Sequence, residues 1–129
     1  MNQFSQKSHT ELISTHVDLQ LIFTEVLKLI DITIIKGHRG EIEQNSAYMN
    51  GMSQLMYPDS QHNAYPSMAI DCAPYPIDWR NKERFFYLAG IVIAITENLY
   101  KKGEISHKIK WGGLWALKDY VHFELYKPQ

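Results

Sequence analysis

The sequence is poor in cysteine and carries little net charge. Cys72 is the one cysteine in 129 residues, so an internal disulfide cannot form, and zinc sites that need several thiolates are excluded. The formal net charge is −1, and lysine and arginine do not cluster. We therefore expect no binding to nucleic acid or to an anionic membrane surface.

Long hydrophobic segments are also absent. The longest apolar run, residues 85–95, is about half of the roughly 20 residues that cross a bilayer. The N-terminal segment is polar and has no apolar core of the kind found in signal peptides. We therefore expect no membrane insertion, and a protein that remains in the cytoplasm until something else releases it.

The length and the lack of repeats or low-complexity linkers predict one domain over residues 1–129, which we expect to be a monomer. Helical periodicity predicts helices over residues 17–30, 41–52 and 80–102. Ser8 and Glu11 resemble a capping box, so a short first turn is expected at residues 12–13 and fraying over residues 1–7.

Four short stretches favour β-strands because they are β-branched or alternate in polarity. They are residues 31–36, 67–73, 107–111 and 121–126. Residues 53–66 are rich in turn formers and predict an irregular segment. Mixed helices and short strands predict an α+β fold, with a small, mostly antiparallel sheet and helices packed on one face.

Polar side chains share one face in two of these predicted strands. Side chains alternate between faces, which places two alanines beside Asp71 and puts Cys72 on the opposite, apolar face. The small alanines predict open space above the carboxylate, and the opposite face makes the thiol unsuitable as a ligand beside it. In the last strand His122 and Glu124 share the face that is not apolar.

A histidine lies nine residues before Asp71, at His62, and His122 offers a third ligand. Two imidazoles and a carboxylate suit zinc, and a site with three protein ligands leaves a fourth position for water. Zinc lowers the pKa of bound water from about 15.7 to about 7. Asp119, three residues before His122, is the candidate for the group that takes the proton.

On spacing alone these histidines could equally be ordinary hydrogen-bonded residues. His38 is the main rival ligand because it adjoins Arg39 after a predicted strand. His9 and His16 are expected to be exposed, and His107 is expected to be a plain residue at a strand edge.

Five short motifs occur in one order along residues 17–125. They are Gly37-His-Arg39 with Gln44; Ser60-Gln-His62; Ser67-Met-Ala-Ile-Asp71-Cys-Ala-Pro74-Tyr-Pro-Ile-Asp-Trp79; Trp111-Gly-Gly113; and Asp119-Tyr-Val-His122-Phe-Glu-Leu125. Together they resemble the L-alanyl-D-glutamate endopeptidases, the phage endolysin branch of the zinc D-Ala-D-Ala-peptidase group. Hedgehog domains and D-alanyl-D-alanine carboxypeptidases are its distant relatives.

The resemblance implies a zinc peptidase domain in which His62, Asp71 and His122 bind Zn²⁺ and Asp119 is the general acid/base. It implies a peptidoglycan endopeptidase that cuts the stem peptide between L-alanine and D-glutamate. Such an endolysin would stay in the cytoplasm of the host bacterium until a holin or lysis from within gave it access to the wall.

The resemblance also implies substrate-binding residues. Arg39 would hold the substrate by polarising its carbonyl or binding a carboxylate, with an ion pair inside the protein as the alternative. Gln44 and Ser60 would be cleft residues, or else a residue on a solvated helix face and a turn cap.

Two features depart from the family pattern. The segment between His62 and Asp71 is longer than in the relatives with the shortest motif, and Leu114 replaces the aspartate of the usual Trp-Gly-Gly-Asp-Trp motif. The second departure bears on activity or specificity rather than on metal binding. Two alternative functions therefore stay open: a D-alanyl-D-alanine carboxypeptidase, and a non-catalytic zinc module that binds peptide or protein.

Overall fold

The computed structural model describes residues 1–129 and contains a four-stranded antiparallel sheet with strand order β1-β2-β4-β3. The strands are β1 (Ile32–Lys36), β2 (Ala69–Pro74), β3 (Lys108–Trp111) and β4 (His122–Tyr126). The helices are α1 (Gln6–Ile13), α2 (Val17–Leu27), α3 (Glu41–Met49) and α4 (Lys82–Lys101). The predicted α+β fold is confirmed.

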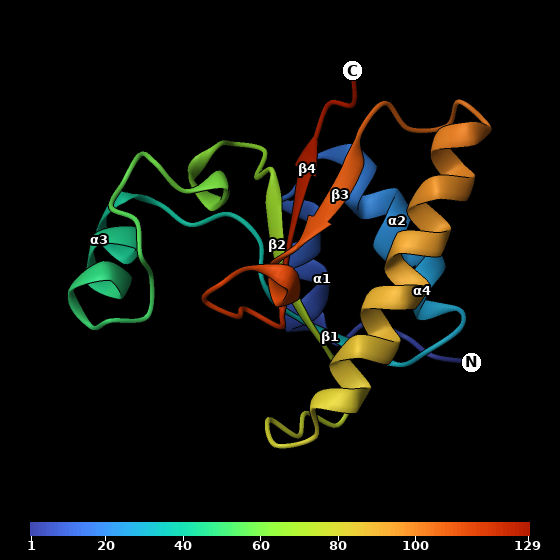
Figure 1. The fold of residues 1–129 in the computed structure, drawn as a ribbon, viewed down its shortest axis with the longest axis horizontal. Helices are drawn as coiled ribbons and strands as arrows, with labels where there is room; N and C mark the ends of the chain where they lie inside the picture. Colours follow the sequence, from blue (N-terminus) through green and yellow to red (C-terminus); the bar gives the residue numbers. More distant parts are fainter.

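Three of the helices build the body of the protein together with the sheet. α1 packs on β1, α4 packs on β2 and β3, and α2 packs on α1 and α4. Figure 1 shows α3 standing apart from them, at the far end of the molecule from α4. None of the helices is both long and apolar enough to cross a membrane.

The core lies between the helices and one face of the sheet. Ile70 and Cys72 on β2 and Phe123 on β4 are fully buried, and the rings of Phe23 and Phe123 meet edge to face at 5.5 Å. The alternation of the strands leaves Asp71 and His122 on the other face. Burial of this apolar face thus fixes the register that brings the polar residues together.

The start of the chain differs from the prediction. α1 begins at Gln6, and its N-cap is Ser5, whose hydroxyl accepts a hydrogen bond from the Ser8 N–H at 3.1 Å. Ser8 is therefore not a cap but a buried helical residue, and its hydroxyl accepts from the Ile34 N–H of β1 at 3.0 Å. This tertiary contact, which local sequence rules do not include, explains why residues 6 and 7 are ordered within the helix.

Two further segments refine the predicted turns. The irregular segment over residues 53–66 contains a short 3₁₀ helix, η1 (Gln61–Asn63), and a second one, η2 (Gly112–Leu114), follows β3. The predicted open space beside Asp71 is wrong, because Ala69 and Ala73 are both fully buried. The face is therefore covered along β2, and only part of the Asp71 side chain reaches solvent.

Candidate metal centre

His62, Asp71 and His122 come together from three different elements. Asp71 on β2 and His122 on β4 are direct neighbours across the two strands, and His62 on η1 reaches the same point. One potential ligand atom from each residue lies within 4.8 Å of the other two. Ser60 caps η1, with its hydroxyl accepting from the His62 N–H at 3.2 Å, so this serine fixes the position of His62.

The spacing of the three side chains suits a tetrahedral ion. Asp71 Oδ1 lies 3.2 Å from His62 Nε2 and 3.3 Å from His122 Nδ1. Two ligands bonded to zinc at about 2.0–2.2 Å in a tetrahedron are about 3.3 Å apart. The donor set therefore suits zinc in its chemistry, and the two separations from Asp71 Oδ1 are those of ligands on one tetrahedral ion.

In each imidazole, the outer ring nitrogen, which faces away from Asp71, has a partner that can only accept a hydrogen bond. His62 Nδ1 lies 2.7 Å from the Gly37 carbonyl, and His122 Nε2 lies 2.8 Å from Glu124 Oε1. These nitrogens therefore carry the protons, and in a neutral ring the inner nitrogens turn lone pairs toward the Asp71 carboxylate. Two lone pairs and an anionic oxygen repel one another unless a cation lies between them.

The charges in this cluster shift its pKa values in the corresponding directions. Burial favours the neutral acid of Asp71, but hydrogen bonds with His122 and His62 outweigh it and hold its pKa well below the usual range. Burial also opposes charge on His122, while the Asp71 and Glu124 carboxylates raise the pKa of His122 to about 9. The cluster thus favours positive charge, which a proton or a metal ion can supply.

Asp119 lies in the loop between η2 and β4, where its backbone is held beside the cluster. Its N–H donates to the Gly112 carbonyl at 3.0 Å, and its own carbonyl accepts from the His122 N–H at 3.3 Å. A side chain on Gly112 would place its Cβ 2.6 Å from the Asp119 carbonyl oxygen, so this close approach requires glycine. Desolvation of the Asp119 carboxyl and the neighbouring Asp71 charge raise the pKa of Asp119.

Arg39 connects the cluster to α3. Its Nη2 lies 3.8 Å from Asp71 Oδ2, and its Nη1 donates to Gln44 Oε1 at 3.1 Å. Gln44 is fully buried and donates to the Leu55 carbonyl at 2.6 Å and to the Ser53 hydroxyl at 2.9 Å. The alternative that Gln44 lies on a solvated helix face is therefore wrong, since α3 turns this side toward the following loop.

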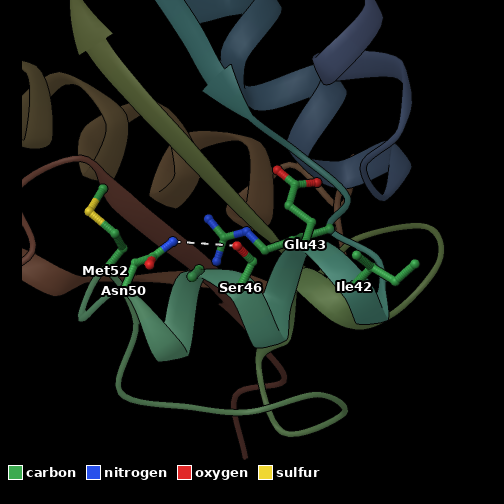
Figure 2. A pocket seen from close by; sticks show the side chains of 7 residues that line it. Ile42, Glu43, Ser46, Asn50 and Met52 are labelled. Carbon is green, nitrogen blue, oxygen red and sulfur yellow. Dashed lines mark hydrogen bonds between the residues drawn. The ribbon is translucent and has the colours of Figure 1, made fainter.

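A hollow of about 570 Å³ lies beside Arg39 along α3. Figure 2 shows residues of α3 and of the turn after it that form its wall, with Ser46 and Asn50 joined by a hydrogen bond of 3.4 Å. The lining residues are Arg39, Ile42, Glu43, Ser46, Ala47, Asn50 and Met52. The lining includes both apolar and polar side chains. One of them is the Arg39 guanidinium, which also forms the ion pair with Asp71.

The rival histidine is not part of the cluster. His38 is partly exposed, and its Nδ1 pairs with the Ala64 carbonyl at 2.9 Å. Cys72 is fully buried in the core, where desolvation raises the pKa of its thiol, and it does not belong to the group of ligand atoms.

A second His-Asp-His group, His16, Asp18 and His107, also has its ligand atoms within 4.8 Å of one another. His107 is buried rather than at an open strand edge, and its Nδ1 donates to Asp18 Oδ2 at 2.7 Å. The Ser106 N–H donates to the same oxygen at 3.0 Å. His16 Nδ1, 4.0 Å from Asp18 Oδ1, accepts from the Asp18 N–H. The 2.7 Å contact is a direct hydrogen bond that leaves no room for an ion between its two atoms, and it ties the start of α2 to the residues just before β3.

Of the two partners of the imidazoles, Glu124 can be predicted from the sequence and the Gly37 carbonyl cannot. The spacing of His122 and Glu124, two residues apart on one strand, is a local signal that the two side chains are neighbours. The Gly37 carbonyl has no such signal, because it reaches His62 only through packing of the loop against α1. A side chain on Gly37 would clash there with the Glu11 carbonyl and the Ser14 hydroxyl.

Comparison with known proteins places these observations in a family. Residues 1–127 match the family described as phage L-alanyl-D-glutamate peptidase. The structure is similar to that of the L-Ala D-Glu endopeptidase ChiX from Serratia marcescens, with 25% sequence identity and a TM-score of 0.78, over 95% of this chain and 89% of that chain. A search of curated protein sequences finds no match. Since the family match covers almost the whole sequence, the chain belongs to the phage L-alanyl-D-glutamate peptidase family.

Proposed function

We propose that the protein is a zinc-dependent endopeptidase of bacterial peptidoglycan that cleaves the L-alanyl-D-glutamate bond of stem peptides during phage lysis. The main support is the arrangement of His62, Asp71 and His122, whose potential ligand atoms lie within 4.8 Å of one another, with Asp71 Oδ1 3.2 Å and 3.3 Å from the two imidazole nitrogens. Family membership supports the choice of substrate and of bond.

The side chains around this centre have two separate roles in hydrolysis, metal binding and proton transfer. Zinc held by His62, Asp71 and His122 would act as a Lewis acid toward the scissile carbonyl and make water a stronger acid. Asp119 takes the proton that the attacking water releases and delivers it to the leaving amine. A carboxylate whose pKa is raised is a better base than an ordinary one, which suits Asp119 to this exchange.

The substrate is proposed to bind along the hollow beside α3. Arg39 at its edge can accept a carboxylate of the stem peptide or polarise a carbonyl, since an arginine forms bidentate bonds with such groups. Gln44 is buried and would position Arg39 rather than touch the peptide. Ser60 would act in the same indirect way, by capping η1 beneath His62.

One observation favours a second candidate, a non-catalytic zinc module. Leu114 is 74% exposed on η2, at the position where the family usually has an aspartate. Asp119 opposes this alternative, because a module without activity has no need of a base beside the metal ligands. Family membership favours an endopeptidase over a D-alanyl-D-alanine carboxypeptidase, and separate assays on a dipeptide and on a whole stem peptide would distinguish them.

The test uses purified protein, bacterial cell walls and mass analysis of the released peptides. We expect cleavage between L-alanine and D-glutamate that a chelator stops and zinc restores. Asp119→Asn should keep stoichiometric zinc and lose cleavage, whereas His62→Ala should lose zinc. Zinc uptake without cleavage by the parent protein would support the module, and full activity of Asp119→Asn would refute the assigned base.

A further inference from the structure

Glu124 contacts His122, one of the three proposed metal ligands, on the side of the ring that faces away from Asp71. It lies two residues after His122 on β4, so both side chains project from the same face of the sheet. Its Oε1 lies 2.8 Å from His122 Nε2, and 19% of its side chain is exposed. The Glu124 carboxylate has no other hydrogen-bond or ion-pair partner.

The neighbours of Glu124 leave this contact undisturbed. Across the sheet Glu124 is paired with Ala69 on β2 and with Lys110 on β3. The Ala69 side chain has no group that could bond the Glu124 carboxylate. The Lys110 ammonium lies over the ring of Tyr126, 5.1 Å from its centroid. The full negative charge of Glu124 is thus directed at one imidazole.

The two imidazoles of the cluster therefore differ in their support. The outer nitrogen of His62 donates to a neutral carbonyl, that of Gly37, whereas the outer nitrogen of His122 donates to a carboxylate. A carboxylate partner fixes the ring orientation and the tautomer, and it also makes the inner nitrogen a stronger electron donor. His122 should accordingly be the stronger of the two nitrogen ligands.

We propose that Glu124 is a positioning residue that holds His122 in the metal-binding tautomer and strengthens its bond to the ion. The proposal rests on the proposed metal centre and adds a residue outside the ligand set. Loss of such a partner commonly weakens metal binding by roughly 10–100-fold.

Two substitutions separate the contact from the charge. Glu124→Ala removes both, and we expect zinc affinity, measured by competition with a chromophoric chelator, to fall by roughly 10–100-fold. Glu124→Gln keeps an oxygen that accepts from His122 Nε2 but removes the charge, so its loss should be smaller. Glu97→Gln, which breaks the exposed 3.0 Å pair with Lys108, is the matched control and should bind zinc like the parent.

A spectroscopic measurement distinguishes positioning from general stabilisation. The visible spectrum of the cobalt-substituted protein should shift in both Glu124 variants and stay unchanged in Glu97→Gln, while unfolding of the metal-free proteins checks that each variant folds. If Glu124→Ala does not fold, the glutamine variant alone decides. Parental affinity and spectrum in the Glu124 variants would overturn the proposal while leaving the proposed function intact. A parent protein that takes up no zinc would overturn both.

Discussion

Gln44 is predicted to hold the α3 segment to the rest of the protein. α3 has few contacts with the sheet and the other helices, as its separate position in Figure 1 suggests. The Gln44 amide donates to Leu55 and Ser53 and accepts from Arg39 and Asn63, so it makes four hydrogen bonds with no exposure to water. Gln44→Met retains the size of the side chain and removes all four.

The cost follows from the groups that are left unpaired. A buried donor or acceptor that loses its partner costs about 1–3 kcal/mol, and the partners at the edge of α3 can recover part of this by contacting water. We therefore expect the free energy of local opening to fall by roughly 2–4 kcal/mol, which corresponds to exchange that is about 30–1,000-fold faster.

Hydrogen exchange followed by mass spectrometry measures this effect directly. Amides in residues 40–58 should exchange faster in Gln44→Met, while those of β2 keep their protection. Gln54→Met is the control, because Gln54 is exposed in the same segment and makes no side-chain hydrogen bond. Unchanged exchange over residues 40–58 would show that other contacts hold α3 and that the role assigned to Gln44 is wrong.

Three further outcomes are expected. Gly112→Ala should lower the cleavage rate, because the added methyl would lie 2.6 Å from the Asp119 carbonyl oxygen and 3.2 Å from the Cβ of His122. Gly90→Ala, with open space around it, is the control, and equal rates would contradict this reasoning. Asp18→Asn should lower the free energy of unfolding at pH 7 by about 1–3 kcal/mol by weakening the bond to His107. Folding lowers the Asp18 pKa, so this stabilisation is complete above the unfolded value of about 3.9 and fades as the pH falls below it. Denaturant midpoints of parent and variant should therefore converge in acid, and a constant difference would count against the pairing. Removal of zinc should lower the melting temperature, since ligand at 100 times its Kd stabilises by about 2.7 kcal/mol, and an unchanged value after verified removal would oppose a bound ion.

Local patterns in the chain were enough to predict most of the secondary structure. Helical periodicity located α2 and α4, alternation located the strands, and together they predicted the antiparallel sheet. Alternation also placed Asp71 and His122 opposite the apolar face, because neighbouring side chains on a strand must point in opposite directions. The family motifs added the proposed ligands and the proposed base.

The contacts between residues that are distant in the chain arise only when the protein folds. Ser8 is a buried hydrogen-bond partner of β1, and Gln44 is a buried link between Arg39 and the loop after α3. His107 is hydrogen-bonded to Asp18, which lies 89 positions earlier in the chain. The directions of the lone pairs in the metal cluster likewise depend on the Gly37 carbonyl and on Glu124. Local propensity cannot specify such contacts, because they form only when packing of the core brings separate elements to a common place.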